Sequence, residues 1–142
     1  LIDSIRVNSK IEQVGITSDG SMGVPKVPTN TAWYMFGPKP GQTGSAVIAG
    51  HLNWWYGAKG VFERLKYLKP GDSITVQDDH GVKTSFIVRS TRTYEPKDDV
   101  SEVFRSDDGK SHLNLVTCTG AWDKVARVYS KRLVVFADKA DK

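Results

Sequence analysis

The sequence predicts an all-β domain, and three observations lead to this class. Roughly seven or eight short stretches alternate apolar with polar residues, which is the period of a strand with one buried face. Turn signals rich in glycine, proline, aspartate and asparagine recur about every ten residues. Helical periodicity is confined to one or two short segments. These features favour a β-barrel or β-sandwich over a doubly wound α/β sheet.

The composition is that of one ordinary globular domain. The chain has 142 residues, of which 39% are hydrophobic and 25% are charged. A chain of this length buries roughly two thirds of its unfolded surface without disulfides or metals. We therefore expect residues 1–142 to form a single domain.

The charge distribution argues against a nucleic-acid-binding protein, and the cysteine content argues against a disulfide-stabilised one. The net charge of +4 comes from 20 basic and 16 acidic residues that are scattered along the chain, without a basic run of five that would indicate a nucleic-acid surface. The single cysteine excludes an internal disulfide, although it leaves the cellular compartment open.

The first third of the chain predicts strands separated by breaks. Residues 4–16 alternate loosely and predict a first strand pair that ends in a turn. The prolines within residues 24–28 indicate an extended edge or loop with a scaffold role, because proline cannot donate to a ladder. Strands are expected at residues 31–36 and again, with small side chains, at residues 45–49.

The middle of the chain predicts a short helix and a hairpin. Residues 61–68 place apolar side chains at i, i+4 and i+7, and Pro70 follows. Residues 73–77 and 82–94 alternate on either side of an Asp-rich turn, which predicts a half-buried antiparallel pair. The long polar connection over residues 96–111 contains one further helical turn at residues 100–104.

The last strands surround the only cysteine. Residues 112–118 alternate, and Cys118 falls where Thr119 and Gly120 are expected to begin a turn; residues 133–137 form the final strand. A thiol at a strand end is better placed to attack a carbonyl than one in a strand centre. The alternative is a buried free cysteine that acts as a small hydrophobe.

Three histidines could serve as a base for this thiol. His112 lies on the same strand as Cys118, about 20 Å away at the usual rise per residue, so it cannot reach the sulfur. His80 falls in the turn between two strands, where solvent exposure without function is the default. His51 follows the small residues Ala49 and Gly50, which allow other segments to approach closely, and it remains as the candidate.

Three motifs in this sequence resemble the sortases, the cysteine transpeptidases of the Gram-positive cell surface. They are IAGH ending at His51, LVTC ending at Cys118, and KRLVVFA, which carries Arg132 14 positions later. The family pattern before the cysteine is usually TLxTC, and here Asn114 replaces the first threonine. The chain looks more like the class D, E and F group than class A or B.

The resemblance covers residues 5–137 and implies a fold and a location. We expect a closed eight-stranded sortase-type β-barrel with one or two short helices. Residues 1–142 are then the sortase catalytic domain, without the N-terminal membrane anchor that the full-length protein would carry. The expected location is the extracellular face of the cell membrane.

The resemblance also implies roles for individual residues. Cys118 is the expected nucleophile, His51 its acid-base partner, and Arg132 the cation that stabilises the oxyanion, with Arg127 as a competitor for that role. Ordinary pKa values near 8.5 and 6.5 would leave roughly 1% of molecules as the thiolate–imidazolium pair at neutral pH. Sortases are thought to work in this reverse-protonated form.

Family position suggests Thr117 and Trp122 as substrate-binding residues, each against the alternative of simple packing. Trp54, Trp55 and Trp122 could wall an apolar peptide side chain or merely close the barrel ends. No cofactor is expected. A loose acidic group could at most hold calcium weakly and is not predicted to do so; it comprises Asp98, Asp99, Glu102, Asp107 and Asp108.

The expected reaction is cleavage of an LPxTG-like sorting signal after its threonine. The acyl group is held as a thioester and passed to an amine of a peptidoglycan precursor or of a pilin lysine. Two alternatives stay open. One is another cysteine acyl-transferase such as an L,D-transpeptidase, although its Ser-x-Gly-Cys surroundings are absent here. The other is a non-catalytic β-barrel that binds peptides.

Overall fold

The computed structural model describes most of the chain. The described residues are 1–2, 5, 7–16, 18, 22–23, 25–27, 29–51, 60–95, 98–123 and 128–140, with only the backbone described for 118–123 and 128–131. Seven strands and two short helical elements are named within them. These are β1 (Ile11–Val14), β2 (Thr31–Tyr34), β3 (Gly44–Gly50), the 3-10 helix η3 (Leu65–Tyr67), β4 (Ser73–Gln77), β5 (Lys83–Tyr94), α1 (Ser101–Phe104), β6 (Ser111–Asp123) and β7 (Val128–Lys139).

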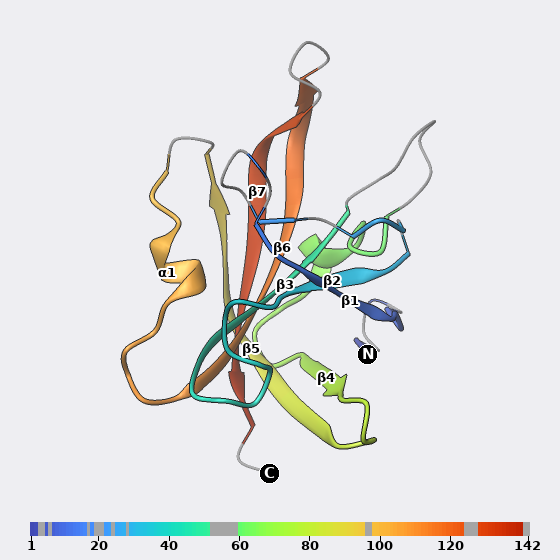
Figure 1. Cartoon of the computed structure of the whole chain (residues 1–142). Coiled ribbons are helices and arrows are strands. Elements are labelled where there is room, and N and C mark those ends of the chain that lie inside the picture. Colours follow the sequence, from blue (N-terminus) through green and yellow to red (C-terminus); the bar gives the residue numbers. More distant parts are fainter. Residues whose placement is uncertain are drawn as a thin grey trace.

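The all-β class is confirmed, whereas the strand count differs from the expected eight. Over the described residues the seven strands form one curled sheet in the order β1-β2-β3-β6-β7-β5-β4, so the structure is a half-barrel with β1 and β4 at its edges (Figure 1). The N-terminal residue lies against one of these edges, because Leu1 and Thr75 of β4 exchange both backbone hydrogen bonds, at 2.7 and 2.9 Å.

The long central strands are buried on both faces. β6 pairs parallel with β3 and antiparallel with β7. Because successive side chains of a strand point to opposite faces, a strand covered on both sides reads as a continuous apolar run. The stretch from Leu133 to Ala137 in β7 has this character. β6 and β7 therefore form the rigid centre from which functional positions can be held.

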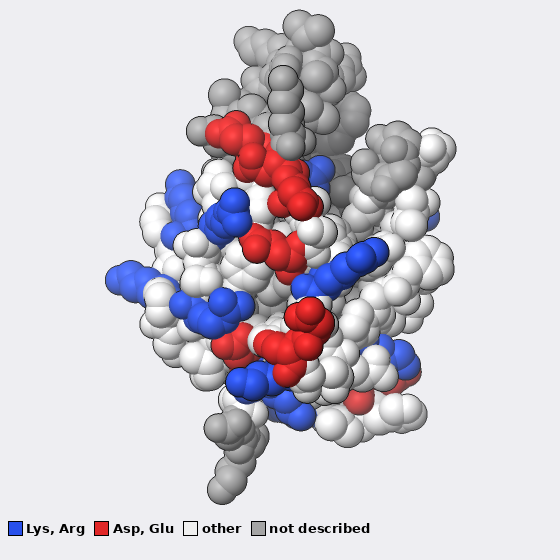
Figure 2. Space-filling model, turned by 90° about the vertical axis from the view of Figure 1, so that its left-hand side faces the viewer, with Lys and Arg blue, Asp and Glu red and all other residues white. Residues whose placement is uncertain are grey.

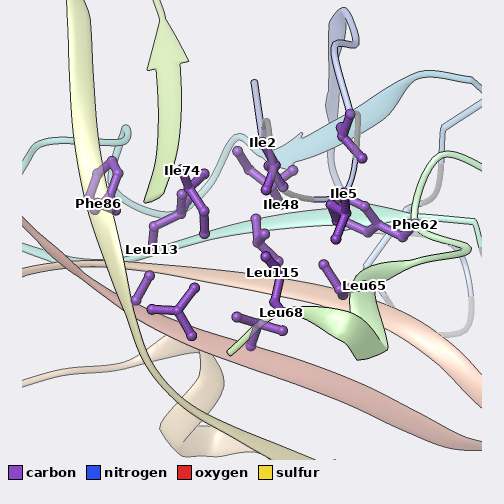
Figure 3. Close-up of a cluster of buried hydrophobic side chains, with 14 of the residues drawn as sticks. Ile2, Ile5, Ile48, Phe62, Leu65, Leu68, Ile74, Phe86, Leu113 and Leu115 are labelled. Carbon is purple, nitrogen blue, oxygen red and sulfur yellow. The ribbon is translucent and has the colours of Figure 1, made fainter. Parts of the chain in front are cut away.

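The main core lies on the concave face of the sheet (Figure 3). Alternate residues of β3, β5, β6 and β7 contribute to it, and the N-terminal segment and the η3 region close it from the other side. Its buried members are Ile2, Ile5, Val7, Ala46, Ile48, Phe62, Leu65, Leu68, Ile74, Phe86, Val88, Leu113, Leu115, Leu133, Val135 and Ala137.

A smaller cluster covers the opposite, outer face of the sheet. Val116, Val134 and Phe136 project from β6 and β7, and α1 packs against them through Val103. Figure 1 shows α1 on this side, away from the N-terminal segment and β1. We call this side the α1 face. The part of the chain that is described contains no helix long and apolar enough to span a membrane.

Two local predictions were wrong. Among the described residues of 4–16, no strand pair forms within the segment: Ile11–Val14 is the one named strand, and it pairs parallel with β2. Residues 61–68 form turns and the 3-10 helix η3 instead of an α-helix. Phe62, Leu65 and Leu68 are the buried residues there, and spacing by three suits the three residues per turn of a 3-10 helix.

The hairpin and the helical turn agree with the prediction. β4 and β5 pair antiparallel from Ser73 with Ile87 to Gln77 with Lys83. Gly81 supplies the positive φ of +83° in the turn between them. The helical turn that was expected at residues 100–104 is α1.

Candidate functional site

The backbone around Cys118 differs from the sequence prediction. We expected a turn to begin at Thr119, whereas β6 continues to Asp123 and stays paired with β7. Cys118 is the backbone partner of Arg132, and the register shifts between Thr119 and Trp122. An irregularity of this kind bends a strand and changes the direction of nearby side chains, and it occurs often beside active sites. The cysteine position is thus immediately before an irregularity rather than at a strand end.

Strand register aligns the three residues that were proposed for catalysis. β3 and β6 run parallel with a constant offset, the last pair being Ala49 with Val116. His51 is the residue that follows β3, which ends at Gly50, and extending the same offset by two residues matches position 51 with position 118. Cys118 in turn pairs with Arg132 on β7. His51, Cys118 and Arg132 therefore occupy one level across three neighbouring chain segments, which we call the cross-strand row.

The strands next to the row present buried valines to the α1 face. Position 118 has the same parity as Val116, and position 132 the same parity as Val134; both valines are buried in the cluster beneath α1. Position 51 likewise continues the parity of Val47, which belongs to the same cluster.

His51 is oriented by a backbone carbonyl. Its ring is partly buried, and Nε2 lies 2.8 Å from the carbonyl oxygen of Pro25. A carbonyl can only accept a hydrogen bond, so Nε2 carries a hydrogen. Nδ1 is then the ring atom at which the charged and neutral forms differ. The backbone oxygen of His51 also accepts from the amide of Phe62, at 3.0 Å.

Glu12 of β1 holds the segment that supplies this carbonyl. Its carboxylate accepts from the amides of Lys26 and Val27, at 3.1 and 3.3 Å, and from Nδ2 of Asn30 at 3.1 Å. These hydrogen bonds, with that of the Lys26 amide first, lower the pKa of Glu12. From the sequence, residues 24–28 were expected to have a scaffold role only, since no residue type signals a backbone oxygen that orients a histidine.

Gly50 makes room directly beside His51. A Cβ atom at this position would lie 2.6 Å from Cδ2 of Phe62 and 2.8 Å from Cγ1 of Val61, closer than packed carbon atoms allow. Gly50→Ala should therefore destabilise the fold by about 1–3 kcal/mol, the usual range for overpacking, and should slow turnover because His51 shifts. Urea denaturation and steady-state kinetics measure both effects.

The matched second variant tests the cause of that loss. Adding Phe62→Leu to Gly50→Ala removes the clashing ring atoms, so the double variant should lose less stability than the two single changes added together. Strictly additive losses would show that the contact with Phe62 is not the reason for glycine at position 50.

Arg132 is exposed and has no hydrogen bond or ion pair with the described residues. Its backbone partner on the other side is Tyr94 of β5. The Tyr94 hydroxyl donates to Glu102 of α1, and Arg92 pairs with the same carboxylate oxygen at 2.7 Å. Burial and the bond to Glu102 raise the pKa of Tyr94 to about 12. The Glu102 carboxylate is thus engaged by Arg92 and Tyr94.

The two residues that were proposed to bind substrate, Thr117 and Trp122, lie at different places on β6. Thr117 is 3% exposed and pairs with Leu133, so it lies on the core face rather than on the face of the row. Its hydroxyl has no partner among the described residues. Trp122 pairs by its backbone with Tyr129 further along the hairpin. Trp54, Trp55 and Arg127 lie outside the described residues.

A hollow of about 640 Å³ opens on the α1 face, over the parts of β3 and β6 that precede the row. Its lining includes strand residues from β3, β5, β6 and β7 and residues of the α1–β6 connection. Acidic and basic side chains intermingle over this face (Figure 2), and several are paired, as Arg89 is with Asp138 at 3.2 Å.

The loose acidic group is held by protein donors. Asp98 accepts from the Glu95 amide, Asp99 from the Ser101 amide, and Asp108 from the Lys110 amide. Within the described ranges no group of three or more histidine, cysteine, aspartate or glutamate side chains is arranged to hold a metal ion.

The other two histidines lie apart from the row. His80 is in the β4–β5 turn with a side chain that is 84% exposed, as predicted. His112 is largely buried, with Nδ1 2.7 Å from Asp138 and Nε2 2.8 Å from Asp108. Two carboxylates can both accept from one imidazole only when both ring nitrogens carry hydrogen. His112 therefore ties the α1–β6 connection to β7.

Asp108 predicts an acid-dependent loss of stability. The Lys110 amide and His112 lower its pKa from 3.8 to about 2. The ionised form is favoured by folding, so the contribution is present above pH ~4 and disappears as the pH falls towards 2. Asp108→Asn should destabilise the protein at pH 5 and match the wild type near pH 2. Thermal denaturation across this range measures the difference, with Asp107→Asn as the control; a difference that does not change with pH would contradict the assignment.

The comparisons with known proteins agree on one family. The family model described as Sortase domain matches residues 1–140. No curated protein matches the chain.

Solved structures resemble the whole fold. Sortase C1 from Streptococcus agalactiae has a TM-score of 0.76 at 22% identity, over 100% of this chain and 66% of that one. Sortase C-1 from Actinomyces oris gives 0.77 at 22% identity, over 100% and 72%. A sortase D5 transpeptidase from Clostridium perfringens gives 0.72 at 23% identity, over 99% and 76%. The chain thus spans about two thirds to three quarters of the length of these proteins, and at such identities the likeness concerns the fold.

Proposed function

The chain belongs to the sortase family, and from this premise we propose that it is a cysteine transpeptidase in which Cys118 is the nucleophile. The observation that carries the proposal is the cross-strand row. It is supported by the backbone pairing of Cys118 with Arg132 and by the parallel register of β3 and β6, whose last pair lies two residues before His51 and Cys118. A thiol, an imidazole and a guanidinium at one level are the groups that acyl transfer through a thioester requires.

The first half-reaction uses all three side chains. The Cys118 thiolate attacks the carbonyl carbon of a peptide bond, and the oxygen becomes an anion beside Arg132, whose fork of donors suits it. The carbon–nitrogen bond then breaks, and the leaving amine takes a proton from the His51 imidazolium. The products are a thioester on Cys118, a neutral amine and a neutral imidazole.

The second half-reaction reverses these steps with another amine. Neutral His51 accepts a proton from the incoming amine as its nitrogen attacks the thioester carbon. The carbon–sulfur bond breaks, and the thiolate and imidazolium are regenerated. The hydrogen bond from Nε2 to Pro25 fixes the ring while the second proton comes and goes at Nδ1.

The substrate that we propose is a sorting signal resembling LPxTG, cleaved after threonine, with an amine of a peptidoglycan precursor or a pilin lysine as acceptor. Class C and class D sortases are among the structural neighbours, and one is described as a Pilus Island 1 sortase C2 of Group B Streptococcus. We further propose that the full-length protein is anchored at the outer face of the cell membrane and needs no cofactor.

A panel of pentapeptides tests this proposal. The peptides differ at the second and last positions, each is mixed with the protein and a small amine, and mass spectrometry identifies the products. The expected result is at least one peptide cut after threonine and joined to the amine. His51→Ala should suppress that product although the thiol remains. Peptides that bind without any product across the panel would favour a non-catalytic peptide-binding barrel.

A further inference from the structure

Helix α1 is fastened to the sheet by side chains of two strands. Nδ2 of Asn114, on β6, donates to the carbonyl oxygen of Val103 at 2.7 Å, and this hydrogen bond is buried. On the β5 side, the Tyr94 hydroxyl and Arg92 both bind Glu102. Val103 itself is 2% exposed and packs into the outer cluster.

The helix is too short to hold this place by itself. It has four residues, its N-cap residue Val100 makes no side-chain capping hydrogen bond, and Asp99 accepts from the Ser101 amide of its first turn. The first turn of a helix is unfavourable to form in isolation, because several dihedral angles are fixed for a single hydrogen bond. The position of α1 is therefore set by its contacts with the sheet.

These contacts lie directly beside the cross-strand row. Val103 packs in one cluster with Val116 and Tyr94. Val116 is two residues, or roughly 6.7 Å along β6, before position 118, and Tyr94 is the backbone partner of Arg132. The helix consequently borders the positions at which we place the chemistry.

Asn114 gains little from its burial apart from this bond. It is 1% exposed, and its Oδ1 has no donor among the described residues. A buried amide that is only half satisfied costs free energy that an apolar side chain of equal size would not. Asn114 stands where the family pattern has threonine, and an amide extends one bond further than a hydroxyl. Its extra length spans the gap from β6 to α1.

We propose that Asn114 is a positioning residue, which together with Glu102 fixes α1 as a preformed wall beside the cross-strand row. This inference rests on the proposed function: the wall would contact the peptide, while the Asn114 amide donates its hydrogen bond to α1. Loss of either contact should loosen the wall and weaken peptide capture, whereas the cysteine, histidine and arginine keep their places.

Hydrogen exchange tests, without any substrate, whether Asn114 and Glu102 hold α1 in place. Asn114→Leu removes the amide at similar volume, and Glu102→Ala removes the second contact from an exposed side chain, so that at least one variant keeps the fold. The amides of α1 should exchange faster than in the wild type by a factor of about 3 to 10, the range that one hydrogen bond is worth. The matched control is Ser111→Ala on the same strand, whose hydroxyl has no partner among the described residues.

Steady-state kinetics test whether α1 contributes to peptide binding. Both variants should raise the KM for the best peptide of the panel by a factor of about 3 to 10, on the same reasoning, with kcat within about twofold, since a loosened wall weakens binding more than chemistry. The rate at which a thiol reagent modifies Cys118 should stay the same. Ser111→Ala should change neither KM nor exchange.

Two results would overturn the inference. Unchanged exchange of α1 in both variants would show that neither contact holds the helix, and faster exchange with an unchanged KM would show that α1 is no wall for the peptide. If the wild type processes no peptide at all, the proposed function fails, while the exchange experiment still decides whether Asn114 holds α1.

Discussion

Replacing Cys118 with alanine should abolish peptide cleavage and transfer and leave the protein folded. Without the thiol no thioester can form, and water held beside His51 and Arg132 is a much poorer nucleophile than a thiolate. A small side chain contributes little packing, so the melting temperature should stay within a few degrees of the wild type. Product formation measured with the best peptide of the panel, together with circular dichroism, checks both parts.

Reactivity of the native thiol provides the control for this variant. Cys118 is the only cysteine of the chain, so any modification by a mild thiol reagent reports on it alone. The folded wild type should react completely. Protection of the thiol until denaturation, or unfolding of the alanine variant together with its loss of activity, would instead support a buried cysteine with a packing role.

Arg132→Ala should lower kcat/KM by a factor of about 10² or more, which is the scale of losing one oxyanion donor. Arg132 shares the level of Cys118 and has no ion pair with the described residues, so its guanidinium is available to a substrate oxygen. Arg132→Lys should recover only part of the loss, because a point charge lacks the planar fork. Steady-state kinetics with one peptide and one amine measures all three proteins.

Two other arginines serve as comparisons. Arg89→Ala removes an exposed arginine that is paired with Asp138 on β7, away from the row, and should leave turnover nearly unchanged. Arg127, which lies outside the described residues, is the competitor for the oxyanion role. If Arg127→Ala cost more than Arg132→Ala, the role would move to Arg127.

The sequence pattern was sufficient to predict the elements that depend on residues close together in the chain. The β4–β5 hairpin followed from alternation around a turn with Gly81, and α1 from one helical turn in a polar connection. β6 and β7 pair Cys118 with Arg132, two residues that the motifs singled out, and their catalytic roles stay predictions. Such features depend on residues close in sequence, and a single chain shows them.

Long-range contacts explain what the sequence did not show. Leu1 pairs with β4 far along the chain, and the continuation of β6 to Asp123 depends on pairing with β7 rather than on the turn signal at Gly120. The carbonyl of Pro25 beside His51 is a backbone atom, which no residue type reveals. Asn114 was noted only as a departure from a motif, and its partner on α1 became apparent from the fold.

Detection of a thioester on Cys118 shows directly whether this residue is the nucleophile. The protein is mixed with a threonine–glycine peptide from the panel and analysed intact by mass spectrometry, followed by digestion to locate the modified residue. The thiolate must release the amine before an acceptor can enter, so the enzyme should gain the mass of the peptide up to threonine, on Cys118. Hydroxylamine should remove that mass and release the threonyl hydroxamate. Peptide binding without this adduct, or an adduct at another residue, would contradict the role of Cys118 as the nucleophile.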